Sequence, residues 1–147
     1  MREEVKMVTG NFFMEILHSE TGEKLSSFEE KNLVVMLGHG NLAKLLGGSS
    51  TGKQIDKIAL GTNGNSPTLN DTAITGMFSK NIQSVSYPGN NSVMFNWAIN
   101  ADEANGITIK EFGLLNQDGV LCARKVRTDI VKTSSVRLVG SWTITFN

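Results

Sequence analysis

The chain has 147 residues, of which 39% are hydrophobic, and its fourteen basic and fourteen acidic side chains cancel. This length suits one domain with a hydrophobic core, and the hydrophobic content excludes a disordered chain. The zero net charge gives no general attraction to phosphates, so we expect no nucleic-acid partner.

The N-terminal residues and the cysteine content bear on where the protein folds. Residues 1–6 have mixed charge with no apolar run behind them, so they do not resemble a signal peptide. No run reaches the roughly 18 apolar residues that a membrane helix needs, so we expect no membrane insertion. The single cysteine, Cys122, excludes an internal disulfide and lies in an alternating segment, where a small buried thiol is the usual role.

Most of the chain alternates between apolar and polar side chains, as β-strands do. In chain order, strands are predicted at residues 12–18, 24–30, 55–60, 77–87, 93–99, 107–116, 119–127 and 135–146. Tight turns at 19–23 and 116–119 join two of the hairpins, and a polar loop rich in glycine and asparagine fills 61–71. The alternation at 77–87 is poor, whereas the last strand is the most regular.

One helix is predicted, over residues 33–46. Its apolar side chains repeat with a period close to 3.6 residues: Leu33, Met36, Leu37, Leu42, Leu45 and Leu46. Asn32 is the expected N-cap, and the pair Gly47-Gly48 is expected to end the helix. Glycine inside a helix costs about 1 kcal/mol relative to alanine, so we also expect a break or kink near Gly38-His39-Gly40.

These elements predict the fold class and the domain organisation. About seven or eight strands with one short helix indicate a mainly β protein, folded as a single antiparallel β-sandwich. No internal repeat and no linker is visible, so residues 1–147 are expected to form one domain.

The segment LGGSSTGKQ at 46–54 contains the spacing of a phosphate-binding loop, with Gly47, Gly52 and Lys53 at the required positions. Gln54 stands where a serine or threonine would hold Mg²⁺. In a phosphate loop the helix follows the glycines and its positive N-terminus faces the phosphate. Here the predicted helix precedes them and a strand follows, so the glycines lie at a helix C-terminus. We interpret the match as accidental and predict no cofactor-binding site.

No other pattern indicates catalysis or metal binding. His18 and His39 have no cysteine or acid nearby at ligand spacing, so we predict no metal site. No local signature singles out a nucleophile. We therefore predict no catalytic residue and no cofactor, and a protein that is not an enzyme.

Two further features leave alternatives open. Residues 1–31 carry seven acids against four bases, and residues 124–137 carry five bases against Asp129 alone. Such runs are usually solvated faces, but they could be complementary patches between neighbouring chains. Trp97 and Trp142 could line a sugar platform; both lie on the apolar side of a strand, which favours burial in the core.

Four stretches, in this order along the chain, carry a resemblance to a known family. They are NLVVMLGHGNLAKLLGG (32–48), IDKIALGTNGNSPTLNDT (55–72), ITIKEFGLLNQDGVLCARK (107–125) and SWTITF (141–146). Together they resemble the small β domain of tail-fibre, tail-collar and baseplate-associated structural proteins of tailed bacteriophages. The hairpin at 111–124 carries most of the likeness, and the glycine-rich loop at 61–67 supports it.

The resemblance implies a non-enzymatic structural protein of a phage or phage-like tail, which forms a ring or trimer of its own copies and binds other tail proteins. It also implies a location in the virion tail, after assembly in the bacterial host cytoplasm. Because no shaft or receptor-binding tip follows the last predicted strand, we expect an adaptor, collar, or fibre- or baseplate-attachment role. The loops 61–71 and 88–92 are the expected docking elements. The alternative is a carbohydrate- or receptor-binding module for host attachment, with a host-surface glycan as ligand.

Overall fold

The structure, a computed structural model, describes residues 8–147. This part of the chain contains nine strands and one helix. The elements are β1 (Val8–His18), β2 (Lys24–Val34), α1 (Met36–Leu46), β3 (Ile55–Gly61), β4 (Phe78–Asn81), β5 (Ser84–Gly89), β6 (Ser92–Ile99), β7 (Thr108–Asn116), β8 (Leu121–Val131) and β9 (Val136–Phe146).

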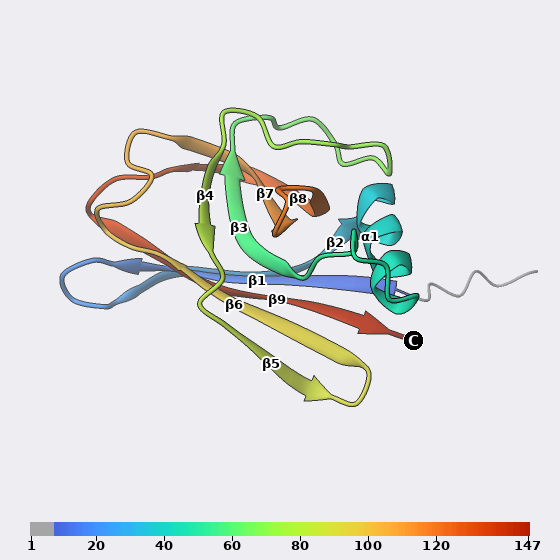
Figure 1. The fold of residues 1–147 in the computed structure, drawn as a ribbon. Coiled ribbons are helices and arrows are strands. Elements are labelled where there is room, and N and C mark those ends of the chain that lie inside the picture. The colour runs from blue at the N-terminus through green and yellow to red at the C-terminus, as the bar shows by residue number, and fades with distance from the viewer. Residues whose placement is uncertain (1–7) are drawn as a thin grey trace, which may run out of the picture.

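All nine strands belong to one antiparallel sheet, with the order β4-β3-β7-β8-β2-β1-β9-β6-β5. The sheet curls so that β3, β4, β7 and β8 lie over β1, β9, β6 and β5, while α1 lies at one end (Figure 1). The two halves are joined where the last two residues of β2 pair with β8, Leu33 with Arg124 and Val34 with Ala123.

The predicted mainly β, antiparallel class with one short helix is confirmed, but the predicted sandwich of seven or eight strands needs correction. The hydrogen bonding is continuous from one half to the other, because β2 is long enough to reach β8. The single strand expected at 77–87 is divided into β4 and β5, which pair with different neighbours. Residues 82 and 83 make the corner between them, and the strand number is therefore nine.

One apolar core fills the space between the two halves of the sheet. The ring of Phe12 on β1 lies 4.8 Å from that of Phe112 on β7 and 4.9 Å from that of Trp142 on β9, measured between centroids. Trp97 and Trp142 are both 0% exposed, so their predicted burial is confirmed. Gly140 makes room for Trp97, because a Cβ at this position would lie 2.4 Å from the indole.

Helix α1 begins later than predicted and is continuous. Leu33 and Val34 belong to β2, and Val35 is the N-cap, so the prediction of Asn32 as N-cap is wrong. No break occurs at Gly38, since α1 is one unbroken helix. The predicted end at the glycine pair is confirmed, with Gly47 as the C-cap and Gly48 at a φ of 73°.

Candidate docking loop

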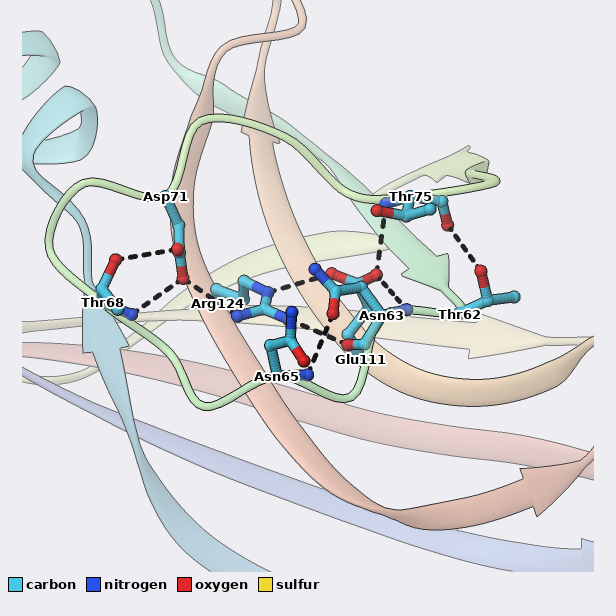
Figure 2. A network of polar contacts seen from close by, with 8 residues as sticks. All are labelled: Thr62, Asn63, Asn65, Thr68, Asp71, Thr75, Glu111 and Arg124. Atoms are coloured by element: carbon cyan, nitrogen blue, oxygen red, sulfur yellow. Dashed lines mark hydrogen bonds and ion pairs between the residues drawn. The ribbon is translucent and has the colours of Figure 1, made fainter.

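The longest described segment outside helices and strands connects β3 to β4. It comprises residues 62–77, here named the β3–β4 loop, and it includes most of the polar loop predicted at 61–71. Long connections inside a compact domain are uncommon unless they serve a function. Figure 2 shows the polar network that ties this loop to β7 and β8.

The centre of the network is the guanidinium of Arg124 on β8, whose side chain is only 2% exposed. Its Nε donates to Glu111 Oε1 at 2.9 Å, and its Nη1 donates to Asp71 Oδ2 at 2.9 Å. Its Nη2 donates to the backbone oxygen of Asn63 at 2.9 Å. Each guanidinium nitrogen therefore has an acceptor, and two of the three acceptors belong to the loop.

Glu111 on β7 provides the second connection and is 0% exposed. Its Oε1 is bound by Arg124, and its Oε2 accepts the N–H of Asn63 at 2.7 Å and the N–H of Thr75 at 3.2 Å. A buried carboxylate needs such donors, because desolvation without them is strongly unfavourable. Gly61 leaves the space for this carboxylate, since a Cβ there would lie 2.8 Å from Oε2.

Asp71 closes a short turn inside the loop. Its Oδ2 accepts the N–H of Thr68 and its Oδ1 accepts the Thr68 hydroxyl, both at 2.9 Å. Partial burial alone would raise the pKa of Asp71, but the hydrogen bonds from Thr68 and the charge of Arg124 outweigh it. The pKa of this carboxyl consequently lies below its ordinary value.

Two contacts outside the network also fix the loop. The backbone oxygen of Leu69 accepts the N–H of Met36 at 2.8 Å, which satisfies one of the unpaired donors at the start of α1. The side chain of Ile74 is 7% exposed and belongs to a small apolar cluster with Val35 and Leu121. The loop is therefore held along its length, while the side chains between these points face solvent: Asn65, Ser66, Thr68, Leu69, Asn70, Thr72 and Ala73.

The sequence pattern predicts the loop but not the residues that anchor it. Asp71, Glu111 and Arg124 all lie within the stretches that carry the resemblance, yet nothing local shows that they meet. A partial signal was present in the β7–β8 hairpin, where the pairs Lys110-Glu111 and Arg124-Lys125 adjoin runs of apolar residues. In the observed register Gly113 pairs with Arg124, which places Glu111 two residues along the adjacent strand.

Gly47, Gly52 and Lys53 lie between α1 and β3, so the predicted order of helix, glycines and strand is confirmed. Their backbone N–H groups are bonded within the chain, to Ala43 O at 3.1 Å, Ser49 O at 3.1 Å and Asn41 Oδ1 at 2.9 Å, respectively. A phosphate loop instead points such groups at its ligand. The geometry favours the interpretation of Gly47 as part of a helix terminator, with Gly52 and Lys53 in the lead-in to β3. The lack of a cofactor site stays a prediction.

The basic segment 124–137 is not an exposed patch, which argues against its use as a charged contact surface. Besides Arg124, it contains the buried Lys125 and Lys132. Lys125 Nζ lies 2.6 Å from Glu30 Oε2, and this hydrogen bond lowers the pKa of Glu30. Lys132 Nζ donates to Asn105 Oδ1 at 2.8 Å, and burial lowers the pKa of Lys132. Among the described residues, one ion pair, Glu30 with Lys125, thus joins the acidic and basic segments inside one molecule.

His18 and Cys122 belong to residue types that often bind metals or act in catalysis, but here they make contacts within the fold. Within residues 8–147, no group of three or more His, Cys, Asp or Glu side chains is arranged to hold a metal ion. His18 Nδ1 accepts the N–H groups of Glu20 and Thr21 in the β1–β2 turn. Burial raises the pKa of the Cys122 thiol to about 11. In this same range, no helix is long and apolar enough to span a bilayer.

Comparison of the chain with family models, curated proteins and solved structures gives no match. The class of the protein is described by its fold and its loop. It is an antiparallel β protein in which buried ion pairs hold one long surface loop against the sheet.

Proposed function

We propose that the chain is a non-enzymatic structural protein of a bacteriophage or phage-like tail. In this role it is an oligomeric adaptor, collar, or fibre- or baseplate-attachment subunit that binds its own copies and other tail proteins. It would act in the virion tail after assembly in the bacterial cytoplasm, without nucleic acid, cofactor or membrane insertion. The motifs of the four stretches that resemble tail proteins support this proposal.

The observation that carries the proposal is the anchored β3–β4 loop. Arg124 and Glu111 hold its backbone at Asn63, Asp71 and Thr75. A loop that is ordered before binding loses little conformational entropy when a partner docks. Most of its solvent-facing side chains are short and polar, with Leu69 and Met77 as the exposed apolar exceptions. Such a loop suits a protein surface rather than a small molecule, which requires a concave site.

The curled sheet suits a part that must keep its shape in an assembly. Its two halves pack face to face over one core, as the sheets of a sandwich do, and a sandwich-like scaffold of this kind supports our proposal. Loops on a rigid scaffold can bind partners without disturbing the core. The short turn at 90–91, between β5 and β6, is the remainder of the second docking loop expected at 88–92.

The glycan-binding alternative has lost its main support. It requires an exposed aromatic platform, but neither indole ring reaches the surface. Tyr87 and Phe146, 76% and 41% exposed, are the exposed aromatic side chains among residues 8–147. Neither belongs to the predicted platform of Trp97 and Trp142, so host-surface glycan binding stays the second candidate.

The test is the protein content of purified particles. Phage or phage-like particles would be prepared from the bacterium that carries the gene and separated into complete particles and tailless heads. We expect mass spectrometry to find the chain in complete particles, in fixed ratio to other tail proteins, and to find none in the heads. A chain that is expressed but absent from every particle fraction would refute the proposal.

A further inference from the structure

Helix α1 is attached to the sheet by a glycine and an amide rather than by its leucines. Gly38 lies directly against β8, where a Cβ would be 2.1 Å from the backbone oxygen of Cys122. Asn41 is 6% exposed, and its side chain exchanges two hydrogen bonds with the backbone of Lys53, at 2.7 and 2.9 Å. Its Oδ1 also accepts from Asn116 Nδ2 at 3.1 Å. These polar contacts fix the helix in one orientation.

That orientation turns much of the apolar surface of α1 toward solvent. Met36 is 56% exposed, Leu37 42%, Leu45 43% and Leu46 86%. A surface helix of a globular protein normally directs its apolar stripe to the core and its polar residues outward. In α1 the two buried residues are Gly38 and Asn41, so the usual arrangement is reversed.

Neighbouring elements extend this apolar surface. Val85 and Tyr87 on β5 are 46% and 76% exposed, Phe146 at the end of β9 is 41% exposed, and Leu69 of the β3–β4 loop is 45% exposed. Together with the four helix residues they form what we call the α1 end surface. It contains eight of the eleven large hydrophobic side chains that are exposed within residues 8–147.

A groove of about 430 Å³ lies within the α1 end surface, between the helix and β5. Leu42, Leu45, Val85, Tyr87 and Phe146 are among its walls. None of the residues that line it is charged. Leu46 and Tyr87, the two most exposed apolar side chains, are of the size that such a groove accepts. The same surface thus carries both protruding side chains and a receptacle for them.

The exposed area is sufficient for a stable contact. The eight side chains present apolar area on the order of 600 Å², if a fully exposed large side chain presents about 150 Å². A standard interface buries about 800 Å² on each partner, and a little over half of this area is apolar. The largest apolar patch of a typical monomer covers about 300–600 Å² and is often functional.

From these observations we infer that the α1 end surface is where two copies of the chain pack against one another. A two-fold contact places identical surfaces face to face, so a charged surface would repel itself whereas an uncharged apolar one does not. The only charged residue of α1 is Lys44. The inference rests on the proposed function only for its setting, since self-association is the first step of forming an oligomeric tail part.

The test is the mass of the full chain in solution, measured by size-exclusion chromatography with light scattering from about 1 to 100 µM. We expect the wild type to form dimers or larger oligomers. Leu46→Glu and Tyr87→Glu should each weaken self-association by about 30-fold or more, because a charge would enter an apolar contact. Leu25→Glu and Val131→Glu are the matched controls, since these side chains are 50% and 63% exposed but lie outside the α1 end surface.

Two outcomes would overturn the inference: a wild type that is monomeric at 100 µM, or an oligomer that Leu46→Glu and Tyr87→Glu leave intact. The result is separable from that of the particle experiment. A monomeric chain found in tails would refute the inference alone, and would assign the surface to another tail protein. An oligomeric chain that both variants dissociate, but that no particle contains, would support the inference and refute the proposed function.

Discussion

The β3–β4 loop and the α1 end surface are both held by polar groups inside the protein, yet they differ in what they show to solvent. The loop is anchored by Arg124 and Glu111, and its outward side chains are mostly polar, so water satisfies it. Helix α1 is anchored by Gly38 and Asn41, and its outward side chains are mostly apolar. Except for Leu69, the middle of the loop shows polar groups that water can hydrogen-bond, whereas the helix leaves exposed apolar area whose burial against a second molecule is favourable.

The difference shows that burial and anchoring are separate properties of a segment. An ion pair or an amide hydrogen bond holds a segment only at particular distances and angles. Apolar contact stabilises a segment in proportion to the apolar area that it buries. Where polar groups do the anchoring, the apolar side chains are free to serve a contact. Mutations and changes of pH at the two sets of anchors test this distinction.

The largest effect is expected for Arg124→Met. It would leave the buried carboxylate of Glu111 without its cation, and breaking a buried pair costs about 3–5 kcal/mol of unfolding free energy. Urea denaturation followed by far-UV circular dichroism measures this loss. Arg137→Met, at a partly exposed position on β9, is the control. A loss below about 1 kcal/mol for Arg124→Met would show that the network does not anchor the loop.

A glycine pair in α1 tests the attachment of the helix. Gly38→Ala should lower the free energy of unfolding by about 1–3 kcal/mol, because its Cβ would meet the backbone oxygen of Cys122, which cannot rotate away. Gly40→Ala should raise it by up to about 1 kcal/mol, because nothing lies within 4 Å and alanine favours the helix. If thermal denaturation showed the same change in melting temperature for both variants, the close packing of Gly38 against β8 would be contradicted.

The pH dependence of stability tests the anchoring of the loop through a smaller expected change in the free energy of unfolding. The folded pKa of Asp71 is below its ordinary value of 3.8, so its contribution is fully present above that value and is lost as the pH falls through the folded pKa. We therefore expect the urea concentration at the unfolding midpoint to decrease as the pH is lowered below about 4. Asp71→Asn should be less stable than the wild type at pH 7, and the difference should shrink toward pH 2.

The control for this experiment is Asp118→Asn, because Asp118 is exposed in the β7–β8 turn. It should change the urea midpoint little at any pH. A constant difference between Asp71→Asn and the wild type from pH 7 to pH 2 would show that the carboxylate charge does not hold the loop.

The smallest effect is expected for tryptophan fluorescence. Trp97 and Trp142 are buried, so glycans and lipopolysaccharide should leave the emission spectrum of the chain unchanged. A saturable shift of the emission on titration with a bacterial surface glycan would revive the carbohydrate-binding candidate. It would also show that the core near these indoles responds to a surface ligand.

Local patterns predicted many of the elements of this fold. The alternation at 12–18, 93–99 and 135–146 identified β1, β6 and β9, because a half-buried strand must alternate. The turn at 116–119 was also correct, and Gly119 has the positive φ of 80° that such a turn accommodates. These features depend on the chain's own dihedral angles and side-chain periodicity, which neighbouring residues largely determine.

Contacts between distant residues account for the errors. The start of α1 was misplaced because Leu33 and Val34 pair with β8, a preference that no local pattern records. The expected kink was wrong because Gly38 serves close packing rather than flexibility. The basic segment looked like a surface patch because the partners of Lys125 and Arg124 lie far away in the sequence.

Local sequence patterns were enough to predict the mainly β class, the single helix and its end, the polar β3–β4 loop, and the burial of both tryptophans. The pairing of nine strands into one curled sheet, and the meeting of Asp71, Glu111 and Arg124, became visible in three dimensions alone. The same holds for the exposure of Leu37, Leu45 and Leu46 on α1. The physical reason is that side-chain periodicity records which residues share a face, whereas the partner of that face is set by long-range pairing and close packing.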